Sequence, residues 1–233
     1  RAAGAPWPSA RQWLLSVPIG VLFFVAGNGF ITIAMQSIDS GAAAVLAATM
    51  PLWLALLAGA AGERSGGREW LGLGLGLAGV VVLVGGASAR GEPAHLVLLL
   101  LSPPAWAVGS LLARRLPLPS GLASAALQMI TGGLALGLVA AARGERFTAD
   151  ATGHAWLALG YLAVAGSLVG FSAFNWLLRN TRPALATSYA YVNPVLAVLI
   201  GAVLGNEPLG PSTLIATSLI VGAVVMVVRG RRT

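Results

Sequence analysis

Eight long apolar stretches, joined by short loops, limit the folds that this sequence can adopt. Each is close to the roughly 20 residues that a helix needs to cross the hydrocarbon core of a bilayer. The stretches are Trp13–Met35, Gly41–Ala61, Trp70–Gly86, His95–Leu112, Gly121–Ala142, Ala155–Leu178, Pro183–Leu204 and Ser212–Val228. The connections leave no room for a soluble domain. The chain is therefore predicted to be an all-α integral membrane protein of about eight transmembrane helices.

The composition excludes a soluble protein. Hydrophobic residues make up 57% of the 233 residues and charged residues only 9%, whereas a soluble domain carries about 25% charged residues. The net charge of +7 comes from Arg alone, and these arginines stand singly or in pairs between the apolar stretches. That spacing is typical of membrane loops, so the lipid bilayer is the expected partner, nucleic acid is not, and a homodimer is left open.

The arginines also predict how the chain is oriented. If both ends are cytoplasmic, the cytoplasmic segments hold eleven Arg and the opposite loops three, which agrees with the enrichment of basic residues in cytoplasmic loops. Residues 1–12 and 230–233 are then cytoplasmic segments. The Arg-rich, Lys-free composition suggests a GC-rich bacterial genome and hence a bacterial inner membrane.

An internal repeat is predicted from the sequence aligned with itself. A shift of 143 residues pairs Gly27 with Gly170 and Pro51 with Pro194, and it places the first three apolar stretches on the last three. Counterparts lie five helices apart, an odd number, so the two halves must have opposite orientations in the membrane. Residues 13–90 are interpreted as an incomplete first repeat of three helices and 91–229 as a second repeat of five. Two further helices are expected before Trp13.

Polar residues inside the apolar stretches are the candidates for a solute site. Pro51 and Pro194 are expected in mid-helix, where proline leaves a carbonyl without its partner. The stretch ending at Pro194 is rich in hydroxyl and amide groups, including Tyr191 and Asn193. The same groups can instead hold helices together, and that alternative stays open.

Catalytic and metal-site motifs are not supported by their context. No acidic or basic residue lies deep within a stretch, which argues against tight proton coupling. His95 and His154 lie just before apolar stretches without metal-ligand spacing. A G-x-G-x-x-G match at Gly74–Gly79 lies inside an apolar span, not after a strand. No enzyme, metal or cofactor is predicted.

Small residues spaced by four predict close helix contacts. The pairs are Gly72 with Gly76, Gly133 with Gly137, and Gly201 with Gly205.

Several segments resemble the EamA-type drug/metabolite transporters of the DMT superfamily. They are Gly27–Gly29, Ser40–Ala44, Trp106–Ser110 and, most specifically, Pro183–Pro194. The resemblance implies a ten-helix bundle of two inverted five-helix repeats around a central cavity, without its first two helices here. By position, it implies a substrate site lined by Asn28, Thr32, Pro51, Trp106, Asn175, Tyr191, Asn193 and Pro194.

The leading hypothesis is transport, in the outward direction, of a small metabolite or drug-like molecule by alternating access. The alternative is a truncated or accessory membrane protein without transport activity. A membrane-embedded enzyme is the third hypothesis, and it requires a His, Glu or Ser constellation within the spans.

Overall fold

Every element described in the structure is a helix. The computed structural model describes residues 7–38, 43, 46–63, 66–84, 92–145, 152–193, 196 and 211–229. The helices are α1 (Ala10–Gly20), η1 (Val21–Gly29), α2 (Phe30–Ala34), α4 (Met50–Ala60), α5 (Gly67–Val84), α6 (Pro93–Arg115), α7 (Leu122–Ala142), α8 (Gly153–Tyr161), η2 (Leu162–Phe171), α9 (Ser172–Asn180), α10 (Pro183–Thr187) and α12 (Pro211–Arg229). Each of the eight predicted stretches contains at least one of them, so the all-α prediction is confirmed.

Within the described part of the chain, four helices are long and apolar enough to cross a membrane. They are Ala10–Ala34, Pro93–Arg115, Leu122–Ala142 and Gly153–Asn180. Many of their apolar side chains lie on the outside, such as Leu138 and Leu157, which are 73% and 74% exposed. A soluble protein avoids such a surface, whereas a bilayer requires it. The chain is an integral membrane protein.

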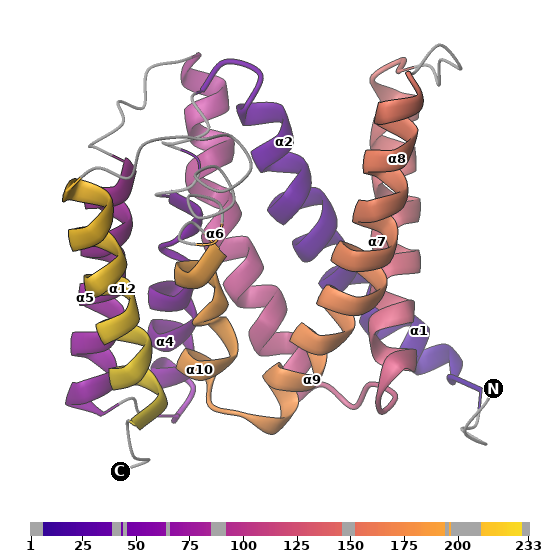
Figure 1. Cartoon of the computed structure of the whole chain (residues 1–233). Coiled ribbons are helices and arrows are strands. Elements are labelled where there is room, and N and C mark those ends of the chain that lie inside the picture. The colour runs from indigo at the N-terminus through magenta and orange to yellow at the C-terminus, as the bar shows by residue number, and fades with distance from the viewer. Residues whose placement is uncertain are drawn as a thin grey trace.

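Two of these long helices contain a π-helical segment in the middle. η1 continues α1 and leads into α2, and η2 lies in the same way between α8 and α9. The first long helix runs upward in Figure 1 and the second runs downward. The repeat predicted from the sequence pairs these two helices, and their opposite directions are those of an inverted pair.

The predicted helix Gly41–Ala61 is interrupted, which corrects the expected position of Pro51. Ala48 and Thr49 form a turn, and α4 begins only at Met50. Pro51 therefore lies in the first turn of a helix, where its missing N–H costs no hydrogen bond. Pro194, its counterpart in the second half, lies outside the described residues.

Glycines bring two helices, α5 and α12, into close contact. A Cβ atom on Gly72 would lie 2.8 Å from Cγ2 of Val227, and one on Gly79 would lie 2.7 Å from Cγ1 of Ile220. A Cβ atom on Gly76 would lie 2.9 Å from Cδ2 of the Tyr191 ring. The predicted contacts of Gly72 and Gly76 are therefore present.

The other predicted glycine contacts fare differently. Gly133 and Gly137 face open space, and their adjacent residue Gly132 makes the close approach instead, against Gly20 and Phe24. The prediction for Gly133 and Gly137 was wrong because spacing does not reveal which side of a helix meets its neighbour. Gly201 and Gly205 lie outside the described residues.

Candidate functional site

Two adjoining compartments lie within the bundle. The first has a volume of about 400 Å³ and the second about 660 Å³. Four side chains border both compartments, namely those of Asn28, Trp106, Tyr189 and Asn193. Together the two compartments have the size of a pocket for a small organic molecule.

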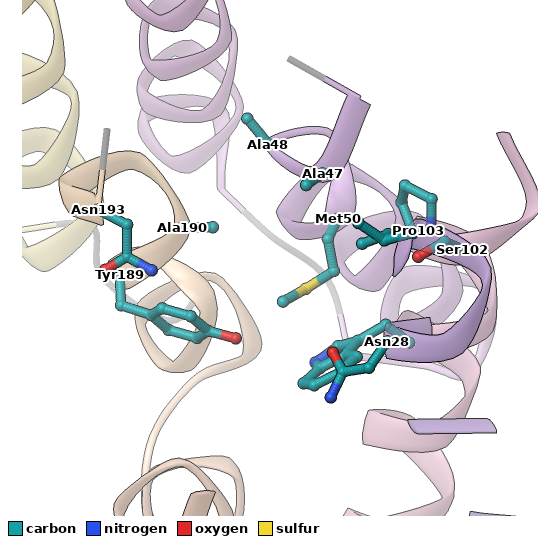
Figure 2. Close-up of a pocket in the computed structure, with 11 residues that line it drawn as sticks. Asn28, Ala47, Ala48, Met50, Ser102, Pro103, Tyr189, Ala190 and Asn193 are labelled. Atoms are coloured by element: carbon teal, nitrogen blue, oxygen red, sulfur yellow. The ribbon is translucent and has the colours of Figure 1, made fainter. Parts of the chain in front are cut away.

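The first compartment lies between η1, α2, α4, α6 and the helical residues 189–193. Its walls include Ile31, Met50, Ser102 and Pro103. Figure 2 shows Tyr189 and Asn193 on one wall and Asn28 on the other, with the hydroxyl of Tyr189 directed across the space between them. Apolar groups cover most of this surface, and the polar groups converge on its middle.

The second compartment is bordered by both π-helical segments. Phe24 and Asn28 come from η1, while Gly166, Ser167 and Phe171 are among the residues that come from η2. The wider turn of a π-helix changes the direction of the side chains that follow it, and such segments are frequent at functional sites. Apolar composition gives no sign of a π-helix, so the sequence did not predict this feature.

Trp106 is fixed by a cluster of aromatic rings. The centroid of its ring lies 5.0 Å from that of Phe23 and 6.0 Å from that of Phe174. Its indole Nε1 is buried and has no hydrogen-bond partner among the described residues. A buried donor without a partner costs about 1–3 kcal/mol, so this indole would gain from an acceptor close to the cavity.

The other polar groups at the middle of the cavity are also free. The side-chain amides of Asn28 and Asn193 and the hydroxyl of Tyr189 make no hydrogen bond to the rest of the described chain. Ser102 differs, because its hydroxyl donates to the carbonyl of Gly27 at 3.0 Å. Two carboxamides and one phenol thus remain available to a solute.

Three of the eight predicted site residues border the cavity: Asn28, Trp106 and Asn193. Thr32 donates its hydroxyl to the carbonyl of Asn28 at 2.9 Å and borders neither compartment. Asn175 is buried and donates to the carbonyl of Phe171 at 3.2 Å. Such bonds to the carbonyl one turn earlier satisfy a donor of each side chain within its own helix. The side-chain Oδ1 of Asn175 is buried and has no hydrogen-bond partner among the described residues.

The remaining predicted site residues lie elsewhere. Pro51 is buried and borders neither compartment, whereas its neighbour Met50 borders the first. Tyr191 is fully buried, and its hydroxyl donates to the carbonyl of Leu73 at 3.2 Å. It therefore joins α5 to the helical residues 189–193, while Tyr189 borders the cavity. Pro194 lies outside the described residues.

A cluster of packed apolar side chains adjoins the cavity. Leu54, Ala107, Leu178 and Ala186 are fully or almost fully buried in this cluster, together with Phe174. They come from α4, α6, α9 and α10. Phe174 belongs to the cluster and also borders the second compartment, so the two are in direct contact.

Ion pairs join the same helices beyond the apolar cluster. Nη2 of Arg114, in the last turn of α6, donates to Oε2 of Glu63 at 2.9 Å, and its Nη1 donates to the carbonyls of Leu178 and Thr181. Glu63 is placed by Gly62, whose φ of +95° ends α4 in a left-handed residue that favours glycine. One arginine thus connects the ends of α4, α6 and α9.

A second ion pair connects the start of α10 to α5 and α12. Arg182, just before α10, pairs with the buried Glu69 at the start of α5. Its Nη2 also donates to the carbonyl of Val227, near the end of α12, at 2.9 Å. The two ion-pair groups, which we call the arginine latch (Glu63, Glu69, Arg114, Arg182), lie beyond the apolar cluster.

The fold and the cavity define a multi-pass helical membrane protein with a solute-sized internal site. Comparison with known proteins identifies the family. The model of the EamA-like transporter family matches residues 3–85 and 94–229. The chain belongs to this family of membrane transporters.

The chain is also similar to individual proteins. The chain is 41% identical over 229 residues to a protein of Escherichia coli strain K12 named "Uncharacterized inner membrane transporter YedA", covering 98% of this chain and 75% of that protein. It is 32% identical over 200 residues to an uncharacterized protein of Pseudomonas aeruginosa, covering 85% of this chain and 68% of that protein. A solved crystal structure superposes with a TM-score of 0.76 at 25% identity, over 98% of this chain and 78% of that one.

Proposed function

We propose that this chain moves a small neutral or zwitterionic metabolite, or a drug-like amine, outward across a bacterial inner membrane by alternating access. The observation that carries the proposal is the cavity bordered by Asn28, Trp106, Tyr189 and Asn193. Asn28 belongs to the first predicted repeat and the other three to the second. In transporters built from inverted repeats, the solute site lies at the interface of the repeats.

Alternating access requires that one side of the cavity be closed while the other is open. The apolar cluster around Leu54 and Leu178, together with the arginine latch, supplies the closure on one side. The side chain of Glu63 is 37% exposed and that of Arg114 is 12% exposed, and water at the carboxylate lowers the net contribution of such a pair to stability. This pair can therefore open and close during a transport cycle.

The arginine latch gives the proposed orientation. Its side of the bundle carries the loops that the arginine count assigns to the cytoplasm. Both ends of the chain are then cytoplasmic, and this structure is closed toward the cytoplasm. In the proposed export cycle, this state is the one that releases the solute outward.

A non-enzymatic role is part of the proposal. Membership of a transporter family supports it, because its members are defined by transport. The groups at the middle of the cavity also suit reversible binding, since amides, a phenol and an indole form hydrogen bonds without covalent chemistry.

Metabolite export tests this function whichever solute the chain moves. Bacteria that express the wild-type chain are compared with bacteria that express the Asn28→Ala, Asn193→Ala double variant, and small molecules in the medium are measured by mass spectrometry. We expect at least one compound to accumulate several-fold more with the wild type, because the double variant lacks both cavity amides.

Asn180→Ala is the matched control. Asn180 is an exposed asparagine of α9 that bonds only to the carbonyl of Trp176, and it borders neither compartment. This variant should export like the wild type. Identical media from wild type and double variant, at equal amounts of protein in the membrane, would contradict the proposed function.

A further inference from the structure

The polar groups bordering the cavity are uncharged and both donate and accept hydrogen bonds. Asn28 and Asn193 each offer an amide N–H₂ and a carbonyl oxygen, and Tyr189 offers a hydroxyl. Among the described residues that border the two compartments, there is no Asp, Glu, Lys, Arg or His. The described residues that border the site therefore donate and accept hydrogen bonds without carrying a charge.

These groups face one another across the first compartment. Asn193 and Tyr189 lie on one wall and Asn28 on the other, and Met50 and Pro103 provide apolar surface on the same side as Asn28 (Figure 2). A group between the walls can donate a hydrogen bond to one side and accept one from the other. A planar carboxamide carries both a donor and an acceptor, as the asparagine side chains do.

A charged group would be poorly stabilised here. An ion moved from water into a low-dielectric site needs an opposite charge or many hydrogen bonds to offset its lost hydration. A cation could in principle bind to an aromatic face. The ring of Trp106, however, packs against Phe23 and Phe174. Its N–H has no hydrogen-bond partner among the described residues and can pair with an acceptor, which a cation does not provide.

We propose that the solutes of this cavity are uncharged at neutral pH and carry a planar group that both donates and accepts hydrogen bonds, such as a primary carboxamide, on an apolar body. This inference rests on the proposed transport function and narrows its solutes. We expect charged amines and carboxylates of the same size to bind more weakly, because no described residue that borders the cavity supplies a counter-charge.

Four compounds with one phenyl ring test this selectivity. They are phenylacetamide, phenylacetate, phenylethylammonium and phenylalanine, which at pH 7 are neutral, anionic, cationic and zwitterionic. Thermal unfolding of the purified chain is followed at increasing concentrations of each compound, because a bound ligand raises apparent stability. We expect phenylacetamide to bind about tenfold or more tightly than each of the other three, a difference of about 1.4 kcal/mol.

An isosteric charge change makes the test specific for this cavity. Asn28→Asp keeps the shape of the side chain and adds a negative charge. The variant should lose about tenfold in affinity for phenylacetamide and gain affinity for phenylethylammonium, which reverses the order of the two. Asn180→Asp, which makes the same change outside the cavity, should keep the wild-type order.

Several outcomes would overturn the inference. The wild type could bind one of the three charged compounds best or all four equally, or Asn28→Asp could leave the order unchanged. The export experiment is independent of these compounds. An exported solute that is charged would refute this inference and leave transport standing, whereas selective phenylacetamide binding without any export would refute transport alone.

Discussion

At the scale of single residues, the position of Trp106 depends on a glycine of a neighbouring helix. A Cβ atom on Gly27 would lie 2.6 Å from Cε3 of Trp106, so only glycine lets the indole lie against η1. The carbonyl of Gly27 also accepts the hydroxyl of Ser102 from the same helix as Trp106. One glycine thus sets both the packing and the polarity of the wall of the cavity.

Two tyrosines, two residues apart, have separable roles. Tyr191→Phe removes the hydrogen bond to the carbonyl of Leu73, and we expect the free energy of unfolding to fall by about 1 kcal/mol while export is unchanged. Tyr189→Phe removes a hydroxyl that has no hydrogen-bond partner among the described residues, so stability should change by less than about 0.5 kcal/mol and export should fall. Thermal unfolding and metabolite export measure the two effects. Normal export by Tyr189→Phe together with lost export by Tyr191→Phe would reverse the assignment.

The sequence predicts some of the cavity residues and not others. Asn28, Trp106 and Asn193 could be found because polar groups within a bilayer must face protein or water. Tyr189 could not be distinguished from Tyr191, since residues two apart on a helix differ by about 200° in direction. The turn at Ser188 sets the rotation of the helix that follows, and no local pattern reveals it.

At the scale of helices, the contact between α5 and α12 depends on particular glycines. Gly79→Ala would place a methyl carbon 2.7 Å from Cγ1 of the buried Ile220. Overpacking of this kind costs about 1–3 kcal/mol, so thermal unfolding should occur at a lower temperature. Gly74→Ala, on the exposed side of the same helix with nothing within 4 Å, should be neutral or slightly stabilising. Equal effects of the two variants would show that this contact contributes nothing to stability.

The helices can be predicted from the sequence, whereas the π-helical segments and the turn before α4 cannot. Length and hydropathy alone predict eight apolar segments, and each contains a helix. The π-helical segments η1 and η2 consist of ordinary apolar residues and glycines, so nothing in their composition distinguishes them. The late start of α4 at Met50 follows from the position of Pro51, but a proline can equally kink a helix or begin one.

At the scale of the whole molecule, the cavity lies between two long helices of opposite direction and above a closed end. Both helices carry their π-helical segment beside the second compartment. The arginine latch connects α4, α5, α6, α9, α10 and α12 at the closed end. A movement that releases the latch would open the cavity to the side that is now closed, as alternating access requires.

Accessibility of a cysteine at position 28 tests this account most directly, because the chain contains no native Cys. Asn28→Cys is treated with an uncharged, membrane-impermeant sugar-linked methanethiosulfonate, added to one face of sealed vesicles at a time. Leu138→Cys, on the lipid-exposed surface, is the control. We predict that Asn28→Cys reacts when the reagent is added to the face opposite the arginine latch. Adding Glu69→Gln, which weakens the latch, should accelerate the reaction of Asn28→Cys from the face on which the latch lies. If Asn28→Cys is as unreactive as Leu138→Cys from both faces, with and without Glu69→Gln, the cavity is no solute pathway and the account is wrong.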